Sequence, residues 1–267
     1  MQAEMLTPRK IREIILDQSK RAHMGHIGPA LSIADIIAAL YGGVLRLSAP
    51  DDPQRDRFVL SKGHAALALY AALYLRDFIS QEQLDTFCSD GTQFGVHPEH
   101  IVPGIDFSTG SLGHGLSYAA GAALAARLQD SPRRVAALLS DAECNEGSLW
   151  EAIMFAGHHR LANLTAIVDA NGQQALGQTA AILDLEPFAE KWQACGWQAT
   201  EVDGHDVAAL SAALDAATQD TSGPSVIIAK TACGKGVSFM ERQVKWHYLP
   251  MSDEDYARAC AELQGQP

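Results

Sequence analysis

The sequence predicts an α/β fold, an open and mostly parallel sheet with helices on both faces. Short apolar runs, such as residues 136–139 and 164–168, alternate with stretches whose apolar residues recur at helical spacing. Runs that are apolar throughout are typical of parallel strands buried on both sides, and their alternation with helices indicates βαβ units. With 267 residues, the chain is long enough for one large domain spanning residues 1–267.

The individual elements follow from local signals. Thr7 and Pro8 provide an N-cap and a first helical residue for a helix over residues 8–24. Residues 65–75 form the longest apolar run, which is shorter than the roughly 20 residues that span a bilayer, so a buried helix is expected. The remaining predicted helices cover residues 31–43, 62–76, 80–87, 116–127, 186–195, 206–217 and 252–263, and the remaining strands 58–60, 197–202 and 226–229.

The centre of the chain predicts a metal site at the edge of the sheet. Two apolar strands flank a helix, for which Ser148 and Glu151 predict an N-terminal capping box. Both strands of such a unit end at the same edge, so Asp141 and Asn171 are expected to face one crevice. Carboxylate and amide oxygens suit Mg²⁺, which leaves positions for phosphate oxygens. The alternative from spacing alone is an ordinary turn aspartate and a left-handed loop asparagine.

Composition restricts the partners and the compartment. The net charge of −12 argues against binding nucleic acid or an anionic membrane. A divalent cation on Asp141 is one way to admit an anionic cofactor despite this charge. The five cysteines form no C-x-x-C pair, and the first residues lack the features of a signal peptide. We therefore expect a cytoplasmic protein with reduced thiols.

Four histidines are candidate site residues, although each has a structural alternative. His26 lies in a glycine-rich turn, where a hydrogen-bonding role is the default. His64 is expected at a helix N-terminus, which gathers anions, so either a phosphate contact or a capping role fits. His97 is held by the following proline, and His247 has the alternative of an exposed loop residue. The loop with Gly110 precedes a helix, but a tight structural turn is its default interpretation.

Several motifs together resemble the transketolase family. The resemblance begins with the pattern Asp-x-x-x-x-Glu-Gly from Asp141, which is followed by a helix and by Val-Asp-x-Asn ending at Asn171. It continues, in family order, in Lys62-Gly63-His64-Ala65, His97-Pro98-Glu99, Thr109-Gly-Ser-Leu-Gly-His-Gly115, Gly234-Lys-Gly-Val-Ser238 and Trp246-His247. Each motif is weak alone, but together they cover residues 10–250 and are specific.

The resemblance implies a thiamine-diphosphate-binding fold of the diphosphate-binding (PP) type and a set of residue roles. Thiamine diphosphate and Mg²⁺, for which Ca²⁺ or Mn²⁺ could substitute, are the implied cofactors. The implied metal ligands are Asp141, Asn171 and the backbone carbonyl of Gln173. The implied cofactor contacts are His64, Gly110, Ser111, Leu112, Ala142, Glu146, Asn171 and His247, and the implied catalytic residues are His26, His97 and His247.

The resemblance also implies a partner. In the family, the acid and the aromatic ring that hold the aminopyrimidine lie in a second domain, for which this sequence has no counterpart. We therefore expect a separate C-terminal, pyrimidine-binding transketolase subunit in an α2β2 assembly. The complex would transfer a two-carbon ketol unit from a ketose phosphate to an aldose phosphate. Alternatives are the α-type subunit of a 2-oxo-acid dehydrogenase and a non-catalytic regulatory or assembly subunit.

One departure from the family pattern bears on the cofactor site. Ser140-Asp141-Ala142 stands where the family usually has Gly-Asp-Gly. A positive φ at Ala142 would cost about 1–3 kcal/mol in strain, whereas a negative φ would accommodate alanine freely. The conformation of this residue therefore separates a weakened cofactor site from an ordinary one.

Overall fold

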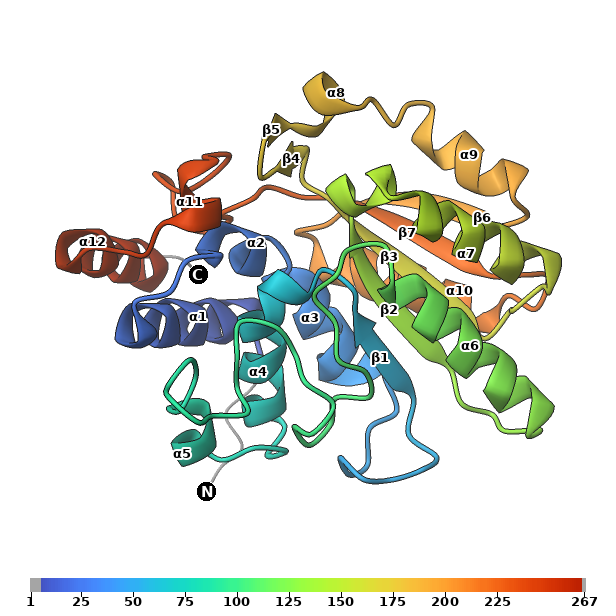
Figure 1. Cartoon of the computed structure of the whole chain (residues 1–267), viewed down its shortest axis with the longest axis horizontal. Helices are drawn as coiled ribbons and strands as arrows, with labels where there is room; N and C mark the ends of the chain where they lie inside the picture. Colours follow the sequence, from blue (N-terminus) through green and yellow to red (C-terminus); the bar gives the residue numbers. More distant parts are fainter. Residues whose placement is uncertain (1–5, 266–267) are drawn as a thin grey trace.

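A five-stranded sheet, in which every pairing is parallel, forms the centre of the molecule. The computed structural model describes residues 6–265, and the sheet has the strand order β1-β2-β3-β7-β6 (Figure 1). The strands are β1 (Arg57–Leu60), β2 (Val135–Ser140), β3 (Leu164–Ala170), β6 (Gln198–Asp203) and β7 (Ser225–Lys230). The predicted open, parallel sheet is confirmed.

Helices cover both faces of this sheet, as expected. In Figure 1, α1, α3, α4 and α10 lie on one side of the strands, and α6, α7 and α9 on the other. The helices are α1 (Pro8–Ala22), α2 (Ile27–Ser32), α3 (Ala34–Ala39), α4 (Ala66–Leu75), α5 (Gln81–Leu84), α6 (Gly115–Leu128), α7 (Gly147–His158), α8 (Thr179–Ile182), α9 (Phe188–Ala194), α10 (Val207–Gln219), α11 (Lys245–Tyr248) and α12 (Asp253–Gln264).

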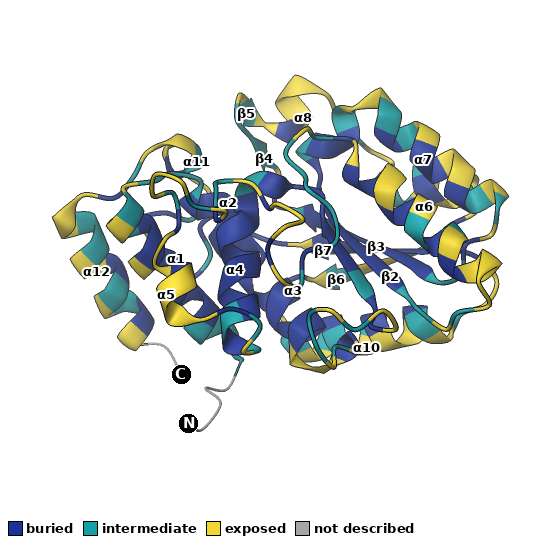
Figure 2. Cartoon of the chain, turned by 60° about the horizontal axis from the view of Figure 1, so that its bottom comes forward, coloured by how far each residue is buried: buried dark blue, intermediate teal, exposed yellow. Residues whose placement is uncertain are grey.

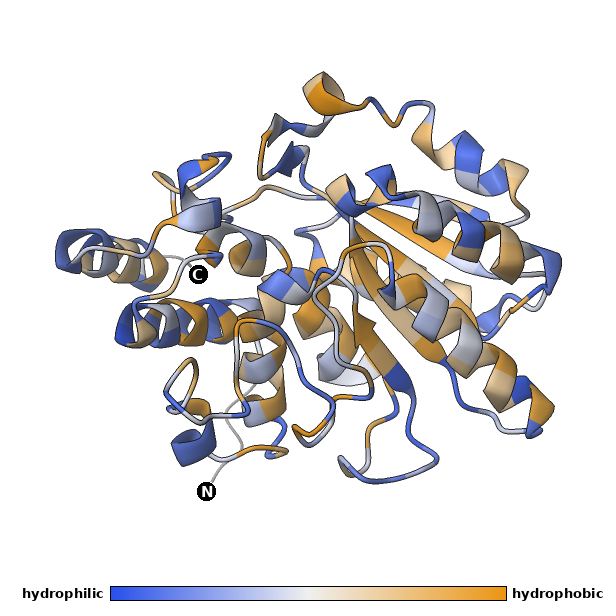
Figure 3. Ribbon diagram, viewed as in Figure 1, coloured by the Kyte–Doolittle hydropathy of each residue, from blue (hydrophilic) through white to orange (hydrophobic). Residues whose placement is uncertain are grey.

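Alternate residues of the strands supply two separate cores. Ala136 and Leu138 of β2 pack into the core that contains α1, α3 and α4, whereas Ala137 and Leu139 pack into the core that contains α6 and α7. Figure 3 shows the central strands in orange because side chains on both of their faces are apolar. Burial on both faces is the physical reason for the uninterrupted apolar runs in the sequence.

Several helix predictions are confirmed in detail. Thr7 caps α1 by accepting a hydrogen bond from the amide of Lys10 at 3.2 Å. Helix α4 is buried over nearly its whole length (Figure 2), as its apolar run predicts. Phe188 and Trp192 of α9 are buried, as expected. No helix in residues 6–265 is both long and apolar enough to cross a membrane.

Three expected helices differ clearly in their bounds, and one of them, expected over 80–87, ends at Leu84 as α5. The stretch predicted as one helix over 31–43 is α2, α3 and a π-helical turn, Leu40–Val44, because the chain turns at Ile33 and at a glycine pair. The helix predicted from Lys62 begins at Ala66, after a 3₁₀ turn at Gly63–Ala65.

The predicted capping box of α7 is wrong. The helix begins at Gly147, so Ser148 lies within its first turn and not at the cap. The Ser148 hydroxyl instead donates to the carbonyl of Gly113 at 3.2 Å, which ties α7 to the glycine-rich loop before α6. A tertiary contact thus replaces the local bond that the spacing predicts.

The elements that the sequence did not predict lie near the carboxyl edge of the sheet. A hairpin of β4 (Gln173–Gln174) and β5 (Gly177–Gln178) follows β3, and α8 and α11 are single turns. Their residues have no apolar periodicity that a sequence pattern could reveal.

Candidate functional site

The ends of β2 and β3 bring Asp141 next to Asn171. Because Ser140 pairs with Asp169 in parallel register, the following residues of both strands leave the sheet at the same edge. Asp141 Oδ2 accepts a hydrogen bond from the amide of Gly172 at 2.8 Å, and Oδ1 accepts one from the amide of Ala142, also at 2.8 Å. The carboxylate is therefore fixed beside the turn that carries Asn171.

The Asn171 side chain is held in one orientation. Its Nδ2 donates to Asp169 Oδ2 at 2.8 Å, and its Oδ1 accepts from the amide of Gln173 at 2.9 Å. The left-handed backbone of this turn belongs to Gly172, with a φ of 73°, and not to Asn171. The amide oxygen, which has a second lone pair, thus lies at the same turn as the Asp141 carboxylate.

The electrostatics of Asp141 favour a bound cation. Burial and the nearby Asp169 carboxylate raise the pKa of Asp141 to about 6. A cation would relieve this cost, and carboxylate, amide and carbonyl oxygens are suitable ligands for Mg²⁺ or Ca²⁺. Among residues 6–265, no group of three or more His, Cys, Asp or Glu side chains could hold a metal ion. A metal ion at Asp141 would therefore need further oxygen ligands from amide groups, backbone carbonyls or a bound phosphate.

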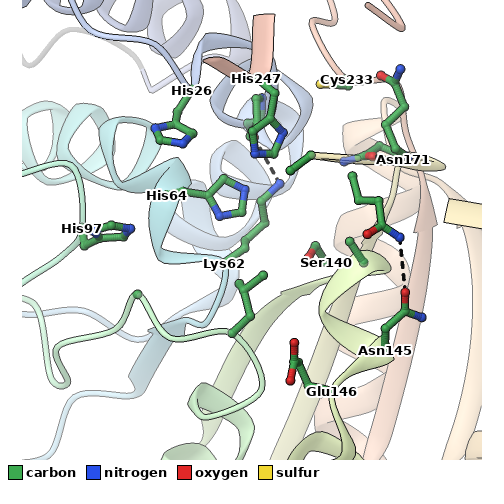
Figure 4. Close-up of a pocket in the computed structure, with 17 residues that line it drawn as sticks. His26, Lys62, His64, His97, Ser140, Asn145, Glu146, Asn171, Cys233 and His247 are labelled. Carbon is green, nitrogen blue, oxygen red and sulfur yellow. Dashed lines mark hydrogen bonds between the residues drawn. The ribbon is translucent and has the colours of Figure 1, made fainter. Parts of the chain in front are cut away.

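Three of the four predicted histidines form a cluster above this turn. The ring centroids of His26, His64 and His247 are 5.2–5.6 Å apart. They line a cavity of about 280 Å³ together with His97, Asn171 and Lys62. In Figure 4, the histidines lie on one side of the cavity, while Ser140, Asn145, Glu146 and Asn171 lie on the other. His23, which neighbours His26 in the sequence, is exposed at the end of α1.

Burial favours the neutral form of these imidazole rings over the protonated form. It lowers the pKa of His247 to about 4 and also lowers the pKa values of His64 and His26. The neighbouring Lys62 ammonium lowers the pKa of His64 further. Nδ1 of His26 is buried without a hydrogen-bond partner. The three histidines are therefore neutral at pH 7. Each can donate a hydrogen bond to an anionic or hydroxylated ligand, and each can accept a proton when such a ligand binds.

The glycine-rich loop divides its predicted residues between two hollows. Gly110 and Leu112 line the cavity of the histidine cluster. Ser111 is exposed and lines a neighbouring hollow of about 490 Å³, which also contains His114 and shares His97 and Gly110 with the main cavity. The loop is anchored by Gly113, whose amide donates to Glu143 Oε1 at 2.8 Å.

Ala142 fits its position without backbone strain. It opens a 3₁₀ turn, Ala142–Asn145, and does not belong to the residues with positive φ. Ala142 and Glu146 both line the cavity, and Glu146 is exposed. Of the two conformations considered for Ala142, the structure has the one that accommodates alanine without strain.

Buried charged residues at the cavity and beneath it were missed as functional residues. Lys62 is 1% exposed and forms an ion pair with Asp169, which is fully buried. Glu143, also fully buried, accepts hydrogen bonds from the Ser61 hydroxyl and from the amides of Gly113 and Ser140. The only sequence signal was their presence in the motifs, since ion pairs between distant residues leave no local pattern.

The fold and the site together define a class of protein. It is an α/β protein whose ligand site lies at the carboxyl edge of a parallel sheet, with oxygen ligands for a cation and a histidine cluster above them. The family model of the transketolase, thiamine diphosphate binding domain matches residues 4–266. The chain belongs to the transketolase family, and it is the part of a transketolase that binds thiamine diphosphate.

The chain matches two kinds of relative: subunits of about its own length, and transketolases more than twice as long. The 6-deoxy-6-sulfo-D-fructose transketolase subunit SqwG of a Clostridium species is 40% identical, over 95% of this chain and 94% of the relative. One of the subunits of the apulose-4-phosphate transketolase of Phocaeicola vulgatus is 38% identical, over 98% and 95%. The crystal structure of Campylobacter jejuni transketolase superimposes with a TM-score of 0.91 at 30% identity, over 99% of this chain but 43% of that chain. These matches favour a transketolase over a 2-oxo-acid dehydrogenase or a non-catalytic subunit.

Proposed function

We propose that this chain is the diphosphate-binding subunit of a two-subunit transketolase. The complete enzyme transfers a two-carbon ketol unit from a ketose phosphate to an aldose phosphate. The length of the subunit relatives, which this chain matches almost from end to end, supports a single domain over residues 1–267. The observation that carries the proposal is the pairing of Asp141 with the Asn171 turn beneath the histidine cluster.

The residues of the cavity have distinct roles in this proposal. Asp141, Asn171 Oδ1 and the backbone carbonyl of Gln173 bind Mg²⁺, and Ca²⁺ or Mn²⁺ can replace it. His64 and His247 donate hydrogen bonds to the diphosphate, because both face the cavity and are held close together. The remaining cofactor contacts are Gly110, Ser111, Leu112, Ala142 and Glu146.

The chemistry requires groups that move protons at the substrate. When bound, thiamine diphosphate supplies a thiazolium ring that stabilises negative charge on the neighbouring carbon. His26, His97 and His247 exchange protons with the substrate hydroxyl and carbonyl oxygens. For His26 and His247, the neutral state at pH 7 suits this role, because a neutral imidazole can both accept and donate a proton.

A second subunit completes the site. The acid and the aromatic ring for the aminopyrimidine come from a C-terminal, pyrimidine-binding transketolase subunit in an α2β2 assembly. Exposed apolar side chains support a protein partner: Tyr118 of α6, and Met154 and Phe155 of α7, are 41%, 55% and 41% exposed on neighbouring helices. The five free cysteines support a cytoplasmic location.

The assay compares the purified chain, alone and with the purified C-terminal-type subunit, in the presence of thiamine diphosphate and Mg²⁺. We expect ketol transfer between sugar phosphates only when both subunits are present, and no decarboxylation of 2-oxo acids. Asp141→Asn should abolish transfer and cofactor binding, as measured by calorimetry. Asp215→Asn, the same change on the exposed face of α10, is the matched control. Transfer by the Asp141→Asn complex at the wild-type rate would refute the metal site.

A further inference from the structure

Asp169, at the end of β3, is a fully buried carboxylate whose oxygens are occupied by four side chains. Oδ2 accepts hydrogen bonds from Ser32 Oγ at 2.6 Å, from Asn171 Nδ2 at 2.8 Å and from Lys62 Nζ, and Oδ1 accepts one from Thr231 Oγ1. These donors come from α2, from the loop after β1, from the loop after β7 and from the turn after β3. Asp169 therefore joins the segments that surround the cavity.

One of these bonds determines the orientation of the Asn171 amide. An asparagine side chain has a donor end and an acceptor end of nearly the same shape, so its neighbours decide which end points where. Here the donor end, Nδ2, faces the Asp169 carboxylate. The reverse orientation would place the amide oxygen against a carboxylate oxygen and leave a buried acceptor unsatisfied.

The consequence concerns the proposed metal site. With Nδ2 held by Asp169, Oδ1 points to the turn, where it accepts the Gln173 amide and keeps a lone pair for a cation. Lys62 neutralises Asp169 within the protein, so this carboxylate is engaged and does not compete with Asp141 for the cation. The contacts thus separate a carboxylate that binds the metal from one that orients a ligand.

From these contacts we infer that Asp169 is a positioning residue, which dedicates the amide oxygen of Asn171 to Mg²⁺ by holding the amide nitrogen. The inference rests on the proposed function, because it assumes the metal site of Asp141 and Asn171. It goes beyond that function in giving the buried Lys62–Asp169 pair a role in metal affinity. An ion pair with only a structural role would affect folding stability, but it would not decide which atom of the Asn171 amide faces the metal.

An exchange of the two residues tests the inference. Asn171→Asp keeps an oxygen ligand and adds a negative charge, so a simple ligand role predicts equal or tighter metal binding. If Asp169 needs the hydrogen bond from the side chain at position 171, the carboxylate of Asp169 and the one introduced at position 171 repel each other, and metal binding weakens instead. In the double variant Asp169→Asn/Asn171→Asp, the amide introduced at position 169 can donate to the carboxylate introduced at position 171, while its oxygen still accepts from Lys62. The double variant should therefore recover affinity.

The measurement uses the complex of both subunits with saturating thiamine diphosphate and Mn²⁺ as the probe. Electron paramagnetic resonance of free Mn²⁺ gives the concentration at half-saturation. We expect Asp169→Asn and Asn171→Asp each to raise it by about 10- to 100-fold, and the exchange to return it to within about threefold of the wild type. Urea unfolding of each variant reports separately on folding.

Ser32→Ala is the matched control, because it removes another donor to Asp169 Oδ2 and leaves Asn171 in place. It should lower stability but change the half-saturating Mn²⁺ concentration by less than about threefold. An equal loss of affinity in this control would overturn the inference, as would wild-type affinity in Asn171→Asp or no recovery in the exchange. If the Asp169→Asn variant does not fold, the half-saturating Mn²⁺ concentrations of Asn171→Asp and of the double variant decide whether the inference holds.

The experiment separates this inference from the proposed function. No binding of Mn²⁺ by the wild-type complex, or no effect of Asp141→Asn, would refute the metal site itself. A wild-type complex that binds Mn²⁺, loses it in Asp141→Asn and keeps it in both Asp169→Asn and Asn171→Asp would refute only the positioning role of Asp169.

Discussion

The carboxylate of Asp141 accepts a hydrogen bond from the backbone amide of Gly172, 2.8 Å from Oδ2. This bond joins the residue after β2 to the residue directly after Asn171, in the turn that follows the neighbouring strand β3. It also consumes only part of the hydrogen-bonding capacity of the carboxylate, because each oxygen can accept more than one bond. The structure thus holds Asp141 in place while leaving it able to bind a cation.

Metal binding should weaken as the pH falls from 7 to 5. The pKa of Asp141 is raised to about 6 by burial and by Asp169, and the carboxyl group must lose its proton to bind a metal. Below pH 6, the apparent Mn²⁺ affinity of the chain should fall by up to about tenfold per pH unit. A titration with Mn²⁺ at several pH values, followed by electron paramagnetic resonance, measures this. An affinity that is independent of pH over this range would contradict the prediction.

Because of the same shift, Asp141 contributes less to the stability of the metal-free protein at neutral pH than at acid pH. A raised pKa means that Asp141 favours folding in its protonated form, fully below about pH 4, and that this contribution is lost as the pH rises through 6. Mg²⁺ should therefore raise the melting temperature more at pH 7 than at pH 5. Asp141→Asn should remove the Mg²⁺ effect, and Asp215→Asn should preserve it.

Binding of the cofactor should be accompanied by proton uptake at His247. Burial lowers the pKa of this histidine to about 4, so it is neutral at pH 7, and an anionic group beside it raises the pKa again. Calorimetry of thiamine diphosphate binding at pH 6, in buffers with different ionisation enthalpies, gives the number of protons taken up. His247→Asn should reduce this number.

The exposed His23 provides the control for that measurement. His23→Asn should leave the proton uptake unchanged, because this side chain lies at the end of α1, away from the cavity. In the absence of ligand, the depressed pKa of His247 contributes stability that is lost as the pH drops from about 6.5 towards 4, which is opposite in sign to the contribution of Asp141 over the same range. Equal uptake in His247→Asn and in the wild type would exclude His247 as the proton acceptor.

Gly25→Ala should disturb the position of His247. A Cβ at Gly25 would lie 2.2 Å from the carbonyl oxygen of Tyr248, the residue after His247. Relief of this clash requires backbone movement in α11 or in the turn that holds His26. We expect a loss of about 1–3 kcal/mol in the free energy of unfolding, as for other overpacked sites, together with weaker cofactor binding.

Gly42→Ala is the matched control for this substitution. A Cβ at Gly42 has no atom within 4 Å, so the same change should alter stability by less than about 1 kcal/mol and leave cofactor binding intact. Urea unfolding and calorimetry measure both effects. Unchanged cofactor binding in Gly25→Ala, despite lower stability, would show that α11 tolerates the displacement.

Ala142→Gly should not improve the cofactor site. Ala142 has a negative φ, so glycine relieves no strain there and increases the conformational entropy of the unfolded chain. We expect a loss of about 0.5–1 kcal/mol in stability and less than a threefold change in thiamine diphosphate affinity. A large gain in affinity would indicate that the alanine methyl group obstructs the diphosphate.

The sequence was most informative where local chemistry and tertiary structure agree. The central strands β2, β3 and β7 are buried on both faces, so most of their residues are apolar, and this makes the strands visible in the sequence. The end of such a run also marks the edge of the sheet, which is why Asp141 and Asn171 could be assigned to one place. Prediction failed at Ser148, where a local capping signal lost to a contact with Gly113, 35 residues away.

By itself, the sequence determined the parallel α/β fold, the meeting of Asp141 and Asn171, and the family, because these follow from apolar runs, from the residues that end those runs and from short motifs in order along the chain. Only the tertiary structure decided that Ala142 is unstrained, that His26, His64 and His247 share one cavity, and that Lys62 and Asp169 form a buried pair. Burial and hydrogen bonding between distant segments depend on how helices pack against the sheet. No local pattern records that packing.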